Sequence, residues 1–346
     1  MQDCNYQYFD SAVSVINSGT RKLLLALPKE QKSIVCEIRM RAEKPLVLIT
    51  ADGYYFLNLE GKLEQYVGEN TLICNAESVT DTFNRLCCYS VHSHLNGIVK
   101  GYVTMQGGHR AGITGTAVTD QSGKITSIRD VSGINIRISK EFKGCADTIV
   151  EKLFKDKNRS IIIAGPPSSG KTTVLRDLVR QLSSKGYYNK IALVDERQEI
   201  ACVNSGIAQN DVGINTDILD CYPKKQAIIQ AVKTLSPDII AIDEVGEESE
   251  IDAIVSGVNS GVKCIVTVHA ENFYEIIHRP HIARLLETYS FEKLVLLKKV
   301  PVGEIEEIYD AGELRDEIIR CGNALDLFCP YGSDGFAKAE NKSYYA

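Results

Sequence analysis

The sequence predicts an α/β fold in which a domain with a mostly parallel sheet follows a smaller N-terminal α+β domain. Two observations support this prediction. From residue 159 onward, short apolar runs alternate with helical segments, which is typical of a parallel sheet covered on both faces. Before that point, residues 97–138 contain many glycines between β-prone runs, as in consecutive hairpins. We expect domains at 1–143 and 144–310, with a C-terminal extension at 311–346.

The N-terminal domain is expected to begin with helices and to continue with strands. Apolar residues recur at helical spacing between Ser11 and Leu27, which predicts one or two short helices that end at Pro28. The glycine-rich part is expected to form hairpins with turns at 106–109 and 120–123. The other expected elements are strands at 34–41, 45–50 and 54–57 and a helix at 76–90.

The second domain is expected to alternate strands with helices after a connecting helix at about 144–155. Its apolar runs are short and continuous, as expected for strands that are buried on both faces. A closing hairpin is expected around 301–303, and residues 331–346 are expected to be disordered. The expected strands are 160–164, 190–194, 238–242 and 263–268, and the expected helices are 171–184, 223–235 and 248–260.

The clearest functional motif joins the first of these strands to the helix that follows it. The motif fits G-x-x-x-x-G-K-[S/T], whose glycines let successive backbone N–H groups turn toward phosphate oxygens. The positive end of the next helix points at the same anion. We expect Lys171 to bind the β and γ phosphates of a nucleotide and the Thr172 hydroxyl to bind Mg²⁺. The alternative, a chance Gly/Pro/Ser loop, is disfavoured by the strand–loop–helix context. The loop residues are Gly165, Pro166, Pro167, Ser168, Ser169, Gly170, Lys171, Thr172 and Thr173.

A second motif, Asp243-Glu244, follows the apolar strand expected at 238–242. Ligands of parallel sheets bind outside the carboxyl ends of the strands, so both carboxylates are expected beside the phosphate loop. Asp243 is expected to hold Mg²⁺, and Glu244 to orient or deprotonate the attacking water. A solvated acidic pair at a strand end is the alternative reading.

Two other expected strands also end in polar residues. One ends in Asp195-Glu196-Arg197, and the other carries Thr267 and His269. Four strand ends are therefore expected to meet at one edge of the sheet. Thr267 and His269 are candidates for sensing the γ-phosphate, although a histidine at such a position can also be purely structural.

Three arginines lie in or beside the glycine-rich part of the N-terminal domain: Arg110, Arg129 and Arg137. They are candidates for cationic groups that reach a nucleotide across a domain or subunit boundary, because phosphoryl transfer is accelerated by such charge. Ordinary surface charge on hairpins is an equally good interpretation.

The composition excludes several classes of protein. With 39 Lys+Arg against 45 Asp+Glu, the net charge is -6, which argues against a generally basic nucleic-acid wrapper. No apolar run approaches the roughly 18–20 residues that span a bilayer, and no signal peptide is expected. The 11 cysteines include no C-x-x-C pair, which favours reduced thiols over a zinc ribbon or a redox dithiol.

Taken together, these motifs resemble the stage III sporulation protein AA family. The resemblance covers about residues 30–305 and is more specific than the phosphate loop alone. The segments that carry it are 37–41, 45–46, 107–112, 134–138, 143–147, 165–180, 193–201, 239–246 and 267–270.

That family is similar to the type II and type IV secretion ATPases, hexameric motors with an N-terminal domain and a RecA-like domain. The resemblance implies hydrolysis of ATP with Mg²⁺ by a homo-oligomer, most simply a hexamer. It also implies membrane-protein partners in the sporulation complex between mother cell and forespore. The chain would be a cytoplasmic protein of the mother cell, held at the membrane by those partners.

The same resemblance assigns Asp195 and Glu196 to the acidic "Asp box" of these ATPases and His269 to their "His box". Two departures stand out. The tetracysteine zinc module of many type II secretion ATPases is missing, and Glu199 competes with Glu196 for any role in the Asp box. The three arginines match the family positions only loosely.

A secretion-type motor ATPase is the function that the sequence favours. The alternative is a nucleic-acid-dependent RecA-like ATPase, which would need a basic, aromatic-bearing face that the sequence does not show. Nucleic acid is therefore not an expected partner. A small-molecule kinase is a third reading, for which neither a lid nor an acceptor pocket can be identified.

Overall fold

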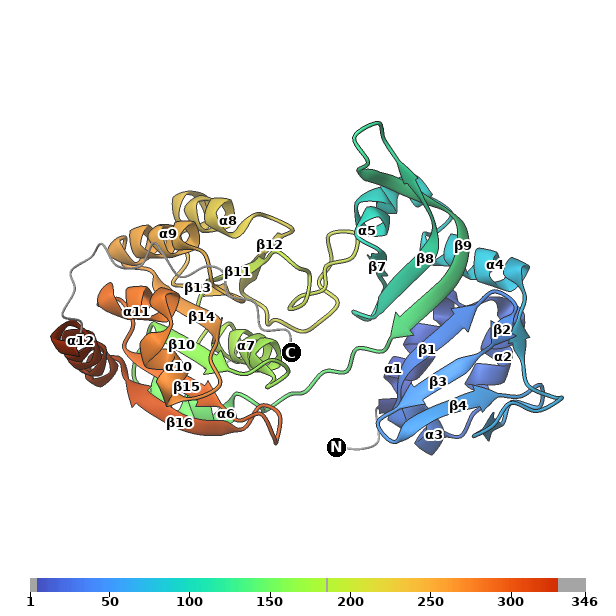
Figure 1. Ribbon diagram of the computed structural model, residues 1–346, viewed down its shortest axis with the longest axis horizontal. Helices are drawn as coiled ribbons and strands as arrows, with labels where there is room; N and C mark the ends of the chain where they lie inside the picture. Colours follow the sequence, from blue (N-terminus) through green and yellow to red (C-terminus); the bar gives the residue numbers. More distant parts are fainter. Residues whose placement is uncertain (1–4, 185, 329–346) are drawn as a thin grey trace, which may run out of the picture. The chain divides into compact units, whose positions relative to one another are not determined.

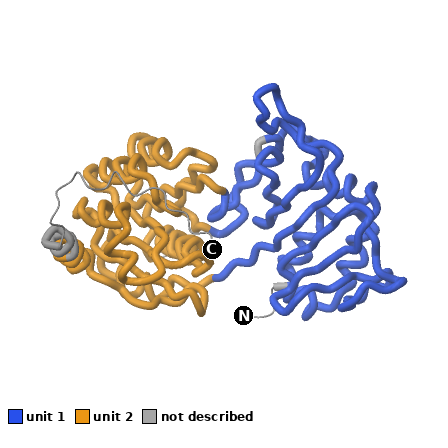
Figure 2. The backbone as a smooth tube through the Cα atoms, in the orientation of Figure 1, with its two compact units in different colours: residues 1–142, 198–211 blue, residues 143–197, 212–346 orange. Residues whose placement is uncertain are grey.

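The computed structural model describes residues 5–184 and 186–328. The chain divides into two compact units (Figure 2). Unit 1 combines residues 1–142 with 198–211, and unit 2 combines 143–197 with 212–346. The disorder expected at 331–346 lies outside the described residues.

Unit 1 is built on a seven-stranded antiparallel sheet with the order β5-β4-β3-β1-β9-β8-β7 (Figure 1). A two-stranded sheet pairs β2 with β6. The strands are β1 (Val35–Arg41), β2 (Lys44–Pro45), β3 (Val47–Thr50), β4 (Gly53–Leu57), β5 (Leu63–Glu64), β6 (Ile73–Cys74), β7 (Tyr102–Thr104), β8 (Arg110–Thr119) and β9 (Ile125–Arg137).

Short helices share one apolar core with this sheet. Phe9 and Ile16 from the N-terminal helical segments and Phe83 from α4 pack in the same cluster as Ile38 and Ile136 of the sheet. Asparagine side chains cap two of the helices, as their sequences favour. The helices are α1 (Asn5–Ala12), η1 (Val13–Val15), α2 (Ser18–Leu25), α3 (Lys29–Ile34), α4 (Ala76–Leu86), η2 (Val91–His94) and α5 (Leu95–Val99). The expected α+β character of this part of the chain is confirmed.

The segment 198–211 belongs to unit 1, although it follows a strand of unit 2 in the sequence. Gln209 Oε1 accepts a hydrogen bond from Gly107 N at 2.9 Å, and Arg110 forms an ion pair with Glu199 at 3.1 Å. Nothing in the local sequence of this segment predicted that it would pack with the hairpins of the N-terminal domain.

Unit 2 contains a second seven-stranded sheet with the order β12-β11-β13-β14-β10-β15-β16 (Figure 1). All neighbouring strands are parallel except β15 and β16, which form the expected antiparallel hairpin. The strand β12 was not predicted. The strands are β10 (Ile161–Gly165), β11 (Ile191–Asp195), β12 (Thr216–Asp220), β13 (Ile239–Ile242), β14 (Lys263–His269), β15 (Lys293–Leu297) and β16 (Ile305–Asp310).

Helices cover both faces of this sheet, as predicted. Ile162 and Ile240 point into a core shared with α8 to α12, whereas α7 contacts β10 and β14 from the other face. No helix among the described residues is both long and apolar enough to cross a membrane. The helices are α6 (Asp147–Ile149), the π-helical η3 (Val150–Phe154), α7 (Lys171–Leu182), α8 (Lys224–Gln230), the π-helical η4 (Ala231–Leu235), α9 (Glu248–Asn259), α10 (Phe273–His278), α11 (Pro280–Glu287) and α12 (Ala311–Phe328).

Candidate functional site

The four strands that carry the predicted site residues are consecutive neighbours in the sheet of unit 2, in the order β11-β13-β14-β10. All three pairings are parallel, so their carboxyl ends lie at one edge. Gly165, the last residue of β10, pairs directly with His269, the last residue of β14. The edge at which a parallel sheet binds its ligands therefore carries all four sets of polar residues.

The phosphate-type loop connects β10 with α7, as the motif requires. Gly170 has φ +90°, and a Cβ there would lie 2.8 Å from Val302 Cγ1. A Cβ on Gly165 would lie 2.5 Å from Ser169 Oγ. Neither position accepts a side chain, because the loop backbone passes too close to its neighbours. The tight loop leads directly into the N-terminus of α7, a position whose backbone N–H groups can bind an anion.

Lys171 is the first residue of α7 and is 5% exposed. Its ammonium donates to Gly165 O at 2.8 Å and to Pro166 O at 2.9 Å. Burial lowers the pKa of Lys171, while the carboxylates of Glu244 and Asp243 act in the opposite direction. The loop thus holds a single positive charge in its interior, where phosphate oxygens would meet it.

Three oxygen-bearing side chains form a second cluster beside the loop. Thr172 Oγ1 donates to Asp243 Oδ2 at 2.8 Å, and Thr267 Oγ1 donates to Asp243 Oδ1 at 2.5 Å. A hydroxyl and a carboxylate are hard oxygen donors, which suit Mg²⁺, an ion that usually takes few protein ligands and completes its shell with water and phosphate oxygens. The residues present therefore fit the metal that the sequence predicts.

Glu244 follows Asp243 in the left-handed backbone conformation, with φ +54°. Its carboxylate is 25% exposed and accepts hydrogen bonds from Arg197 Nη1 and His269 Nε2, the latter at 3.2 Å. A non-glycine residue with positive φ is strained, and such strain is concentrated at functional sites.

His269 links the lysine of the loop to this carboxylate. Lys171 Nζ lies 3.1 Å from His269 Nδ1, and an ammonium group can only donate. His269 Nδ1 is therefore the acceptor, and the ring carries its proton on Nε2, which faces Glu244. The chain Lys171–His269–Glu244 joins three residues that the sequence assigned to the same chemistry.

The acidic residues at and after the end of β11 do not form one cluster. Asp195 is 2% exposed at the end of the strand, and Glu196 lies 3.8 Å from Lys224 Nζ. Glu199 belongs to unit 1, where it pairs with Arg110. The three positions that competed for a role in the sequence thus have three different surroundings.

The three candidate arginines all belong to unit 1, whereas the phosphate-type loop belongs to unit 2. Arg110 stacks on the Tyr102 ring at 3.6 Å besides its pair with Glu199. Arg137 Nε lies 3.5 Å from Glu37 Oε2, and Arg129 Nε lies 3.6 Å from Asp130 Oδ2. A role for any of them at a nucleotide stays a prediction.

Sequence reasoning missed two residues at this site. Arg197 was noted only as part of an acidic run, and it contacts the Glu244 carboxylate. Lys224, at the start of α8, was not noted at all, although its ammonium donates to Glu244 O at 2.6 Å. Two successive lysines after Pro223 were the only signal, and this is too common a pattern to indicate a site.

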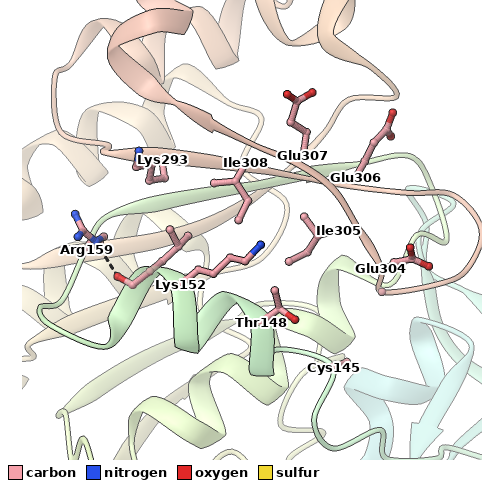
Figure 3. A pocket seen from close by; sticks show the side chains of 12 residues that line it. Cys145, Thr148, Lys152, Arg159, Lys293, Glu304, Ile305, Glu306, Glu307 and Ile308 are labelled. Atoms are coloured by element: carbon pink, nitrogen blue, oxygen red, sulfur yellow. Dashed lines mark hydrogen bonds between the residues drawn. The ribbon is translucent and has the colours of Figure 1, made fainter.

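A cavity of about 810 Å³ lies next to the loop, between α6, η3 and β16 (Figure 3). Gly303, which lines it, donates through its N–H to Ser169 O of the loop at 2.8 Å. The labelled side chains come from both walls and mix cations, such as Lys152 and Lys293, with carboxylates such as Glu306. None of the predicted site residues lines this cavity.

A family model and a curated relative give the same family. The family model described as sporulation stage III, protein AA matches residues 9–315. A curated relative, the stage III sporulation protein AA of Bacillus subtilis (strain 168), is 33% identical over 301 residues, which is 86% of this chain and 93% of that protein. The type IV pilus ATPase PilU of Pseudomonas aeruginosa is 30% identical over 135 residues, 38% of this chain and 33% of that protein.

Two solved structures share the fold. The ATPase DotB of Yersinia pseudotuberculosis aligns with a TM-score of 0.54 at 16% identity, covering 90% of this chain and 85% of that one. The pilus retraction motor PilT with bound ADP aligns with a TM-score of 0.54 at 15% identity, covering 88% of each chain. The expected RecA-like P-loop fold, with its N-terminal domain, is confirmed.

Proposed function

Because the chain belongs to the sporulation stage III protein AA family, we propose that it is a Mg²⁺-dependent ATPase that works as a secretion-type motor. Its sequence and structural neighbours include a type IV pilus ATPase, the ATPase DotB and a pilus retraction motor. The observation that carries the proposal is the set of three contacts around the loop: His269 bridges Lys171 and Glu244, and Thr172 is bonded to Asp243.

In the proposed reaction the loop residues from Gly165 to Thr173 hold the phosphates. Backbone N–H groups at the start of α7 and the Lys171 ammonium bind the β and γ phosphate oxygens. Thr172 and Asp243 would hold Mg²⁺, which would supply positive charge to the phosphates. The protein fixes these donors before the substrate arrives, which lowers the cost of organising them in the transition state.

Glu244 is the proposed general base or water-orienting residue. Its carboxylate lies at the carboxyl edge of the sheet, one residue after the metal-binding Asp243. His269, with its proton on Nε2, donates to one carboxylate oxygen of Glu244 and accepts through Nδ1 from Lys171, so its position depends on that of Lys171. This arrangement supports His269 as a candidate for sensing the γ-phosphate, whereas Glu196, the Asp-box candidate, lies against Lys224.

The motor proposal adds assembly to hydrolysis. We propose a homo-oligomer, most simply a hexamer, which energises a membrane-embedded sporulation complex between mother cell and forespore. In that assembly the chain works at the cytoplasmic side of the mother-cell membrane, attached through partner proteins. Arg110, Arg129 or Arg137 would then supply charge to a nucleotide held by the same or a neighbouring chain.

The test is hydrolysis of ATP by the purified chain, with Mg²⁺ and with EDTA, next to Lys171→Ala. We expect hydrolysis that needs the metal, and loss of both nucleotide binding and hydrolysis in the variant. Light scattering with and without a non-hydrolysable ATP analogue tests assembly. A chain that binds no nucleotide at all contradicts the proposal, and hydrolysis that depends on added single-stranded DNA would favour a nucleic-acid motor.

A further inference from the structure

Lys224 occupies an unusual position for a cation. It is the first residue of α8, where the positive end of the helix disfavours positive charge, and it is only 9% exposed. Buried lysines are rare unless they are paired. The contacts of this side chain must therefore offset two unfavourable features of its surroundings.

Those contacts converge on the segment that follows β13. The Lys224 ammonium donates to the backbone carbonyl of Glu244 at 2.6 Å. It also lies 3.4 Å from Glu250 Oε1 and 3.8 Å from Glu196 Oε2. One ammonium group is thus surrounded by two carboxylates and one peptide oxygen, a set that matches its three donors.

The other polar groups of this segment are held as well. Glu244 N donates to Thr267 Oγ1 at 2.7 Å, and Val245 N donates to Thr267 O at 2.9 Å. Glu250 Oε2 accepts from Gly246 N at 3.0 Å and from Glu247 N at 3.2 Å. Every backbone N–H from residue 244 to 247 therefore has a named acceptor, and Lys224 holds the carbonyl at the strained position.

From this arrangement we propose that Lys224 is a positioning residue for the hydrolysis of ATP. Its hydrogen bond to the Glu244 carbonyl fixes the left-handed backbone that directs the Glu244 carboxylate toward His269 and Lys171. Glu250 and Glu196 keep the buried charge paired, so the role of Glu196 is to support Lys224 rather than to touch the nucleotide. This inference rests on the proposed ATPase function.

The mechanism follows from geometry. A general base must lie within hydrogen-bonding reach of the water that it activates, and a displacement of about 1 Å can lower the rate on the order of 100-fold. Glu244 has φ +54°, so without its partner the peptide can relax to the ordinary φ below zero. Such a rotation turns the carboxylate away from His269, while the phosphate-binding loop keeps its own bonds to Lys171.

The experiment compares Lys224→Met with Lys225→Met in the full chain. Lys225 is the next residue of α8 and is exposed, so it provides a matched loss of charge. In Lys224→Met we expect kcat to fall about 10- to 100-fold while the KM for ATP and the affinity for a fluorescent ATP analogue change less than about twofold. Lys225→Met is expected to match the wild type. Full kcat in Lys224→Met overturns the proposal.

A double-mutant cycle separates a positioning role from a general structural one. If Lys224 acts through Glu244, then Lys224→Met should cause no further loss in a Glu244→Gln background, measured in single turnover. If the rate losses of the two single variants multiply in the double variant, the proposal is overturned. A wild-type chain that binds ATP without hydrolysing it would instead contradict the proposed function.

Thermal unfolding followed by circular dichroism shows whether the variants fold. If Lys224→Met does not fold, the test uses Glu196→Gln instead. Glu196 is 38% exposed, and losing its charge leaves Lys224 in place with one carboxylate partner. We then expect a drop in kcat of about threefold with unchanged nucleotide affinity, in line with a weakened but intact contact. An unchanged kcat overturns the proposal.

Discussion

Thr267 offers a sharp test of the site, because one hydroxyl connects both acidic residues. The residue is 0% exposed, and its Oγ1 donates to Asp243 Oδ1 at 2.5 Å while it accepts from Glu244 N at 2.7 Å. Thr267→Val preserves the shape of the side chain and removes only these two bonds. Thr172 still donates to Asp243 in the variant, so the site should keep its overall architecture.

The size of the effect follows from the type of bond lost. A hydrogen bond to a charged group contributes about 1.5–3 kcal/mol. If that energy serves to hold Asp243 and Glu244 for the reaction, kcat should fall about 10- to 150-fold, because each 1.36 kcal/mol in the barrier is a factor of ten. The Mg²⁺ concentration needed for half-maximal rate should rise as well.

Steady-state phosphate release over a Mg²⁺ titration measures both quantities. Thr234→Val is the matched control, because Thr234 in η4 is exposed and its hydroxyl donates to Gln230 O, at the end of the preceding α8, at 2.8 Å. Its kcat and Mg²⁺ dependence should equal those of the wild type. If Thr267→Val retains full kcat at limiting Mg²⁺, the hydroxyl does not organise the two carboxylates and the reasoning fails.

Three further predictions concern the loop and the pH dependence of stability. Gly170→Ala should lower nucleotide affinity at least about tenfold in an equilibrium binding assay, because its Cβ would meet Val302 Cγ1 at 2.8 Å and its φ is +90°. Burial lowers the pKa of His109 to about 4, so between about pH 6.5 and 4 only the unfolded chain takes up the proton. The free energy of unfolding of unit 1 should therefore fall as the pH is lowered through this range. In denaturant titrations, His109→Gln should flatten that pH dependence. Burial alone would raise the pKa of Asp177, but hydrogen bonds from Ala146 N, Arg180 and Gln181 outweigh that effect, and the net result is a lowered pKa. The stability that Asp177 adds should therefore be present above about pH 4 and lost as the pH falls further. If the difference in free energy of unfolding between wild type and Asp177→Asn stays constant between about pH 6 and 3, this prediction is wrong.

The sequence predicted the loop and the four strand ends because their signals are local. The run from Gly165 to Thr173 joins an apolar strand to a helix, and the conformation of such a loop depends on its own glycines and on the helix that it opens. The carboxyl edge could be predicted since parallel strands with intervening helices must place their ends together. These constraints operate within one strand–helix unit at a time.

Other features depend on contacts between distant parts of the chain and therefore left no local signal. Segment 198–211 packs with unit 1 through residues such as Gln209, about a hundred positions from its partner Gly107. Strand β12 has three polar residues among its five and lies at the edge of its sheet, so it resembles a loop in sequence. Lys224 meets Glu244 across 20 residues, and only the folded sheet brings the two together.

The central claim is that Glu244 activates water for hydrolysis of a nucleotide held by the loop. Glu244→Gln keeps the size of the side chain and removes its basicity, so it tests that claim most directly. The measurement pairs the affinity for ATP with the single-turnover rate of hydrolysis in wild type and variant. We expect an ATP affinity within about threefold of wild type and a rate reduced at least about 100-fold. Undiminished turnover in Glu244→Gln would contradict it.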